Sequence, residues 1–303
     1  MKDADTLLPP GFHEVREGGA RLAVRDELLE PVRKALGPLY HAWSRIAQRR
    51  FTASGRSGVV SFPLGNEAGN LMVRRYAHGG LLAGILKDLY LGPGRAYMEL
   101  AVSEAARLGG VRTPKAVGAL AIRARGPFWR LAFMTREVSD SEDLVHFCCR
   151  LNDYPPETAG REKRGVIREA ARQVRRMHDL GILHADLHLK NLLLRRREDG
   201  PPQVHVIDFD RAALHPELSP EQRLRNLKRL ARSVRKVRVA DAVLTDRDKI
   251  RFLRYYLSGA PDAEDRARLW MRKLARAGRG REVWWAATRA KRGIRGDRIG
   301  NIR

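Results

Sequence analysis

Three oxygen-bearing side chains stand at the spacing that phosphoryl transfer requires. Asp186 and Asn191 lie in the run HADLHLKN (184–191), and Asp208 follows the apolar run 204–207. Phosphoryl transfer needs a carboxylate to orient and deprotonate the attacking hydroxyl, and hard oxygen ligands to hold Mg²⁺ against the phosphates of ATP. Asp186 fits the first role, and Asn191 and Asp208 fit the second. The pattern predicts a phosphotransferase that uses ATP and Mg²⁺.

Each of these residues has a simpler interpretation when it is taken alone. An aspartate after a strand is most often a turn residue or a helix cap, and Asp208 escapes that interpretation only through its association with the other two. His184 is expected to brace the loop by hydrogen bonds. A metal site formed by His178, His184 and His188 is not favoured, because their spacing fits no known ligand pattern.

The elements that must position these residues change character along the chain. Strand-like runs and one helix come first, and helical spacing dominates after Val138. The expected strands are 59–62, 71–74, 117–122 and 129–135, the expected helices are 94–108 and 164–180, and the runs 192–194 and 204–207 can pair as strands. The sequence thus predicts an α+β fold with a β-rich lobe, a hinge near 135–139 and an α-rich lobe. The expected divisions are an N-terminal extension with one helix over 28–50 (1–50), an N-lobe (51–138), a C-lobe (139–275) and a basic tail (276–303).

A glycine-containing turn is the first candidate for nucleotide binding. Gly55, Arg56 and Gly58 lie between strand-like segments. Backbone N–H groups in such a turn can cover the phosphates of a nucleotide. A Gly-Arg-Ser-Gly stretch is usually no more than a turn, so this assignment depends on its neighbours.

A pair of opposite charges is the second candidate for nucleotide binding. Arg74 ends the strand 71–74 at the place where a kinase carries its phosphate-binding lysine, and Arg75 and Lys87 compete for that role. Glu99 on the helix 94–108 is the expected ion-pair partner of this cation, with Glu104 second. An ordinary salt bridge on a helix surface is the alternative for both acids.

The charge and the cysteines bear on partners and compartment. The chain carries 59 Lys and Arg residues against 35 Asp and Glu residues, a net charge of +24. Such a field attracts polyanions, although an arginine-rich proteome would produce the same excess without a partner.

The stretch 223–239 is typical either of a basic helix lying on an anionic membrane or of a helix packed on the core. Cys148 and Cys149 are the only cysteines, which fits a reducing cytoplasm, and neither a signal peptide nor a membrane span is expected.

Five stretches, in order over about residues 50–240, resemble one known family. They are VRRYAHGGL (73–81), LYLGPGRAYMEL (89–100), HADL (184–187), IDFDR (207–211) and the basic run NLKRLARSVRK (226–236). Together they resemble the lipopolysaccharide core kinases, most of all those that act on 3-deoxy-D-manno-octulosonic acid (Kdo).

This resemblance implies a protein-kinase-like fold of two lobes with the active site in the cleft. It also implies ATP-dependent phosphorylation of a Kdo hydroxyl on lipid A-linked Kdo, at the cytoplasmic face of the bacterial inner membrane. Asp186 would be the base, Asn191 and Asp208 the Mg²⁺ ligands, and Arg74 with Glu99 the pair that positions the nucleotide. The expected partners are the lipid acceptor and an anionic membrane surface, with no nucleic acid, and the oligomeric state is left open.

Two positions depart from the family patterns. Asp210 stands where protein kinases carry the glycine of D-F-G, which argues against a protein kinase. His188 stands where Kdo kinases commonly have asparagine, and H-x-D-L-H-x-x-N is typical of aminoglycoside and choline kinases. A small-molecule kinase of that type is therefore the alternative. A non-catalytic binding module on a kinase fold is a further one, and the intact Asp186, Asn191 and Asp208 argue against it.

Overall fold

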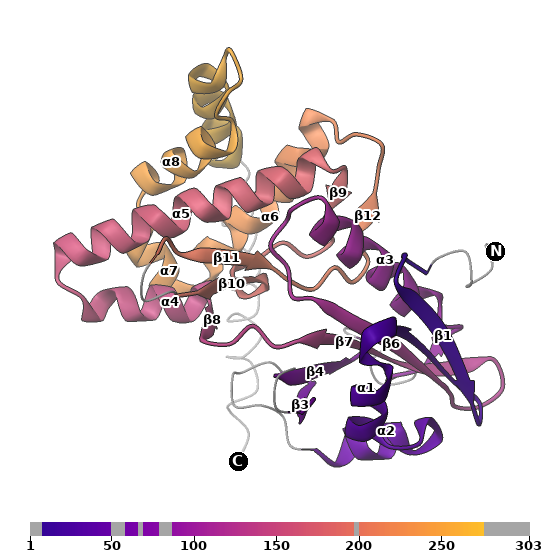
Figure 1. Cartoon of the computed structure of the whole chain (residues 1–303). Helices are drawn as coiled ribbons and strands as arrows, with labels where there is room; N and C mark the ends of the chain where they lie inside the picture. Colours follow the sequence, from indigo (N-terminus) through magenta and orange to yellow (C-terminus); the bar gives the residue numbers. More distant parts are fainter. Residues whose placement is uncertain (1–7, 50–57, 66–68, 79–86, 197–199, 276–303) are drawn as a thin grey trace, which may run out of the picture.

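The protein combines a large antiparallel sheet with a set of helices that lies beside it (Figure 1). The structure is a computed structural model and describes residues 8–49, 58–65, 69–78, 87–196 and 200–275. The sheet is built from the first half of the chain and most of the helices from the second half. The mixed α and β class expected from the sequence is confirmed.

Seven strands of the described residues form the large sheet, and all neighbouring pairs are antiparallel. In spatial order they are β1 (Phe12–Glu17), β2 (Ala20–Arg25), β6 (Ala116–Arg123), β7 (Phe128–Arg136), β4 (Asn70–Arg75) and β3 (Val59–Pro63), with β5 (Tyr90–Leu91) paired to β7. Alternate side chains point to opposite faces. One face packs on α1 (Leu29–Leu36) and α2 (Leu39–Gln48), and the other on α3 (Gly94–Leu108). The strands and the helix expected in residues 58–136 are therefore confirmed.

The first fifty residues differ from the expected extension with a single helix. Strands β1 and β2 form a hairpin through Gly18 and Gly19, whose φ angles of 54° and 79° suit a tight turn that favours glycine, and β2 pairs with β6 in the main sheet. The expected helix over 28–50 is two helices. Gly37, with φ 70°, ends α1, and Pro38 cannot continue it because proline lacks the N–H that a helix interior needs.

The helical part surrounds one apolar core. Its helices include α4 (Leu144–Arg150), α5 (Pro156–Asp179), α6 (Pro220–Lys236), α7 (Arg238–Val243) and α8 (Asp246–Tyr256), and a further helical run covers residues 263–275. Helix α5 begins at Pro156 rather than at the expected residue 164, since proline is favoured in a first helical turn, where its missing N–H has no partner to lose. Val166, Ala170, Val174 and Met177 form the expected buried stripe of this helix.

Five short strands tie the loops of the helical part to one another. Strand β10 (Leu192–Arg195) pairs with β11 (Gln203–Val206), as the sequence predicts, and also with β8 (Ser141–Asp143). Strand β9 (Ile182–Leu183) pairs with β12 (Ala213–Leu214). The loops that carry Asp186 and Asp208 are thereby held at both ends.

Helix α6 packs on the core, so the interpretation of this stretch as a helix lying on a membrane is wrong. Leu224, Leu227, Leu230 and Val234 are buried in the core of the helical part, because the apolar stripe faces that core, with α7 and β9 packed against the helix, instead of a lipid surface. Within the described ranges, no helix is long and apolar enough to cross a bilayer.

Candidate active site

A cleft of about 790 Å³ lies between the sheet and the helical part, a size in the usual range for small-molecule sites. Its walls come from strands β3, β4 and β7, from α3, from the connection 137–140, from β8 and α4, and from the loops around Asn191 and Asp208. The connection 137–140, next to the expected hinge at 135–139, leaves β7 and lines this cleft. Residues from both halves of the chain therefore meet at one site.

His184 supports the loop that carries Asp186. Its imidazole is buried, its Nε2 lies 3.0 Å from the carbonyl oxygen of Ile207, and its Nδ1 accepts a hydrogen bond of 3.0 Å from the backbone N–H of Asp186. The proton is thus assigned to Nε2, and burial lowers the pKa of His184. Asn226 donates to the carbonyl oxygen of His184 at 2.7 Å and accepts from buried His178 at 2.9 Å. The geometry fits the bracing role expected for His184.

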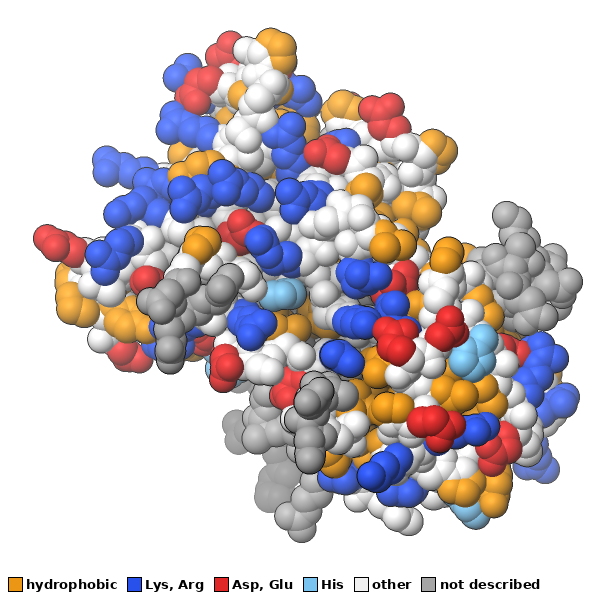
Figure 2. All heavy atoms as spheres, viewed as in Figure 1, with side chains coloured by type: hydrophobic (Ala, Val, Ile, Leu, Met, Phe, Trp, Pro, Cys, Tyr) orange, Lys and Arg blue, Asp and Glu red, His pale blue; other side chains and the backbone are white. Residues whose placement is uncertain are grey.

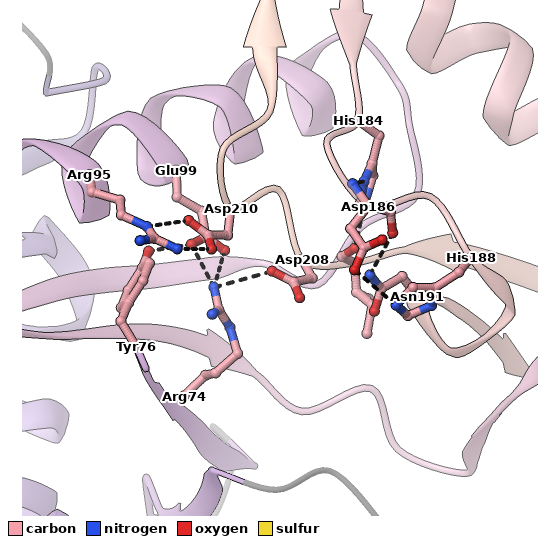
Figure 3. A network of polar contacts seen from close by, with 11 residues as sticks. Arg74, Tyr76, Arg95, Glu99, His184, Asp186, His188, Asn191, Asp208 and Asp210 are labelled. Atoms are coloured by element: carbon pink, nitrogen blue, oxygen red, sulfur yellow. Dashed lines mark hydrogen bonds and ion pairs between the residues drawn. The ribbon is translucent and has the colours of Figure 1, made fainter. Parts of the chain in front are cut away.

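The Asp186 carboxylate projects from this braced loop (Figure 3). Its side chain is 64% exposed, with His188 Nε2 3.4 Å from Oδ2 and Arg229 Nη1 3.5 Å from Oδ1. Asn191 donates its side-chain N–H to the backbone oxygen of Asp186 at 3.0 Å. The amide oxygen of Asn191 is the side-chain atom left for a ligand in the cleft.

Asp208 occupies a strained position at the end of β11. Its φ of 66° lies in the left-handed region, which is uncommon for residues other than glycine and clusters at functional sites. Its Oδ1 is buried without a hydrogen-bond partner among the described residues, and it lies 3.4 Å from Nη2 of Arg74. Asp208 and Asn191 both line the cleft, and a carboxylate oxygen together with an amide oxygen is a donor set that suits a hard cation such as Mg²⁺.

Arg74 and Glu99 form a largely buried ion pair in the wall of the cleft. Nη2 of Arg74 lies 2.6 Å from both carboxylate oxygens of Glu99, and Tyr76 donates its hydroxyl to Glu99. Burial raises the pKa of Glu99 to about 6 against the opposing effect of Arg74. Burial also opposes the charge of Arg74, but the carboxylates of Glu99 and Asp208 raise its pKa overall.

The competing candidates for these two positions lie elsewhere. Glu104 pairs with Arg25, with 2.6 Å between Nη2 and Oε1, and with Arg107. Arg75 and Lys87 are not among the described residues that line the cleft, whereas Arg74 is. The structure thus brings Arg74, Glu99 and Asp208 together.

A second ion pair, which sequence reasoning missed, joins α3 to the loop after Asp208. Arg95 donates from Nε and Nη2 to the two oxygens of Asp210 at 2.7 and 2.5 Å. The guanidinium lies over the rings of Tyr76 and Tyr90, 5.3 and 4.8 Å from their centroids. The sequence pointed to this pair only through the unusual aspartate at position 210. Its partner could not be identified because Arg95 is distant in sequence.

The remaining predicted site residues receive less support. Gly55 and Arg56 lie outside the described residues. Gly58 has a φ of 96°, and its carbonyl oxygen accepts from the backbone N–H of Arg75. In the part of the chain that the structure describes, no group of three or more His, Cys, Asp or Glu side chains is placed to hold a metal ion.

Comparison with known proteins gives a consistent result. The model of the lipopolysaccharide kinase (Kdo/WaaP) family matches residues 42–256. The chain is 31% identical over 260 residues to the 3-deoxy-D-manno-octulosonic acid kinase of Xylella fastidiosa (strain M12), covering 82% of this chain and 94% of that protein. It is 28% identical over 196 residues to the enzyme of the same name from Vibrio vulnificus (strain YJ016), covering 63% of this chain and 75% of that protein. A solved structure described as WaaP in complex with acyl carrier protein is similar in fold, with a TM-score of 0.50 and 21% identity over 82% of this chain and 98% of that one.

Proposed function

This chain belongs to the lipopolysaccharide kinase (Kdo/WaaP) family, and from that premise we propose that it transfers the γ-phosphoryl group of ATP to a hydroxyl of Kdo on lipid A-linked Kdo. The observation that carries the proposal is the position of Asp186 at the border of one cleft, where its backbone oxygen accepts a hydrogen bond from the lining residue Asn191, while Asp208 and the Arg74–Glu99 pair also line that cleft. The first three come from the helical part and the pair comes from the sheet-bearing part. Phosphoryl transfer requires both kinds of group: residues that activate the hydroxyl and hold the metal ion, and residues that position the phosphates of the nucleotide.

Each residue has a role that its surroundings support. The exposed Asp186 carboxylate accepts the proton of the acceptor hydroxyl as its oxygen attacks phosphorus. Arg74, held in place by Glu99, contacts the phosphates of ATP, and its planar fork of donors suits a phosphate as well as lysine would. Asn191 and Asp208 would hold Mg²⁺, which when bound supplies positive charge against the phosphate oxygens. Gly58, with Gly55 and Arg56, is proposed to cover the phosphates.

The same premise favours a protein-kinase-like arrangement of two lobes. The sheet with α1 to α3 corresponds to the nucleotide-binding lobe, and the part from α4 onward corresponds to the catalytic lobe. We place the division at the connection 137–140, which lines the cleft. Since β1 and β2 belong to the main sheet, the proposed nucleotide-binding lobe includes much of the first fifty residues.

We also propose that the protein works at an anionic membrane surface, where a lipid-linked acceptor would lie. Helix α5 carries an exposed basic stripe formed by Arg161, Arg164, Arg168 and Arg172. Figure 2 shows Lys and Arg side chains gathered along this helix at the upper left of the view. A cluster of basic side chains adds favourable energy next to anionic lipids.

Transfer of labelled phosphate tests the main proposal. Wild type with [γ-³²P]ATP, Mg²⁺ and a Kdo-linked lipid A precursor should label the lipid, and Asp186→Ala should lower labelling by at least about a hundredfold, as for loss of a general base. Binding of ATP by both proteins is the control. Tight ATP binding by wild type without lipid labelling would favour a different hydroxyl acceptor. The alternative of an aminoglycoside or choline kinase, which rested on His188, is not favoured by the relatives found.

A further inference from the structure

The two oxygens of the Asp186 carboxylate face two different basic side chains. His188 approaches Oδ2 and lines the cleft. Arg229 approaches Oδ1 from helix α6, and that helix contributes none of the described residues that line the cleft. Asp186 therefore stands at the border between the cleft and a surface on which α6 presents Arg229.

Most of the N–H donors of the Arg229 guanidinium make no hydrogen bond to a described residue. Its side chain is half exposed, and among the described residues its one recorded partner is Asp186, at a long 3.5 Å. A guanidinium carries five N–H donors in one plane and matches a carboxylate with two parallel hydrogen bonds. Neighbouring core positions Leu227 and Leu230 are buried, so the backbone beneath Arg229 is fixed while its head group faces outward.

The acceptor proposed above needs such a group. An octulosonic acid carries a carboxylate on the same sugar ring as its hydroxyls, so a hydroxyl placed at Asp186 brings a second negative charge close to that of Asp186. Two like charges at short distance repel each other unless a cation lies between or beside them. Arg229 is the cation that the fold places at Asp186 on the side away from the cleft.

We propose that Arg229 binds the carboxylate of the acceptor sugar and so makes the enzyme specific for a sugar acid; this inference rests on the proposed function. The guanidinium pairs with the acceptor carboxylate while the hydroxyl of the same ring reaches Asp186. His188 and Lys190 line the cleft, where the transferred phosphoryl group must lie, and are left for phosphate charge. A neutral sugar would lack the group that Arg229 recognises.

A comparison of two soluble acceptors tests the assignment in the full-length protein. The acceptors are a methyl glycoside of Kdo with a free carboxylate and the same glycoside as its methyl ester. Wild type should prefer the free acid in kcat/KM by about ten- to a hundredfold, the range for a charge-assisted hydrogen bond. Arg229→Gln should lose that preference, and Arg229→Lys should keep only part of it, because lysine lacks the planar fork.

The control is Lys236→Gln, which removes one positive charge from an exposed position at the end of the same helix and should retain the preference. Equal losses on both acceptors in Arg229→Gln would overturn the assignment and make Arg229 a residue that only positions Asp186. A wild type that phosphorylates acid and ester equally well would also overturn it. A wild type that phosphorylates neither acceptor, nor the lipid-linked one, would overturn the proposed function itself.

Discussion

The ion pair between Arg95 and Asp210 is expected to hold helix α3 in the position that the active site needs. Both bonds are short, and the two side chains are only 20% and 18% exposed. Glu99 lies one helical turn after Arg95, so a loosened helix end would shift the partner of Arg74. We therefore expect Arg95→Ala and Asp210→Ala to weaken both the fold and ATP binding.

The size of the effect follows from the burial of the pair. Removal of one partner from a fully buried pair costs about 3–5 kcal/mol, and exposed pairs contribute about 0–1 kcal/mol. With about four-fifths of each side chain covered, we expect each single substitution to lower the free energy of unfolding by about 2–3 kcal/mol. Since both substitutions remove the same two hydrogen bonds, the double variant should cost little more than either single one.

A double-mutant cycle measures this coupling. Urea unfolding of wild type, both single variants and the double variant gives the free energies, and steady-state kinetics gives the KM for ATP. We expect a coupling energy of at least about 1.5 kcal/mol and a KM that rises about tenfold in each single variant. A coupling below about 0.5 kcal/mol, or an unchanged KM for ATP, would refute the argument that this pair positions α3.

Three further predictions follow from charges described above. The pKa of Glu99, about 6 in the folded protein, predicts an acid limb near pH 6 in kcat/KM for ATP that is absent in Glu99→Gln. Because this pKa lies above its unfolded value of 4.5, Glu99 destabilises the fold as pH rises from 4.5 to about 6, which urea unfolding of the same two proteins would show. Burial lowers the pKa of His178 from 6.5 to about 4, so the free energy of unfolding of wild type should fall as the pH is lowered from 6.5 to about 4. If a His178→Gln variant loses as much stability over the same pH range, His178 is not the cause of the loss. Replacement of the four arginines of the basic stripe by Gln should lower binding to anionic vesicles at low salt at least a hundredfold, at about 1 kcal/mol per residue, with neutral vesicles as the control; equal binding of both proteins would count against a membrane role for α5.

Local patterns in the sequence predicted much of this fold. The apolar runs of β3 and β4 and the apolar stripe of α5 lie in short windows whose pattern is visible directly. The strand pair β10 and β11 was also predicted, because a glycine- and proline-containing turn separates two apolar runs. Each of these elements depends on neighbours along the chain.

The parts that were missed depend on distant partners. Strands β1 and β2 are half-polar and short, and their assignment to the sheet depends on β6, nearly a hundred residues later. The contact between Arg95 and Asp210 spans a similar separation. The apolar face of α6 could be assigned to the core only once the rest of the helical part was in place, since the same pattern suits a membrane-bound helix. The grouping of Asp186, Asn191 and Asp208 was anticipated because a motif, not a single residue, carried it.

The short strands that tie the reactive loops have a consequence for the entropy of binding. The loop 184–191 is closed by β9 and β10, and the loop 207–212 by β11 and β12, with β9 paired to β12 and β10 to β11. The two loops thus form a ring whose ends are joined by backbone hydrogen bonds, and its conformational freedom is lost when the protein folds. These residues therefore lose little further conformational entropy when substrate binds. Substrate binding should add little hydrogen-exchange protection to their amides, and most of the added protection should appear in segments outside this ring.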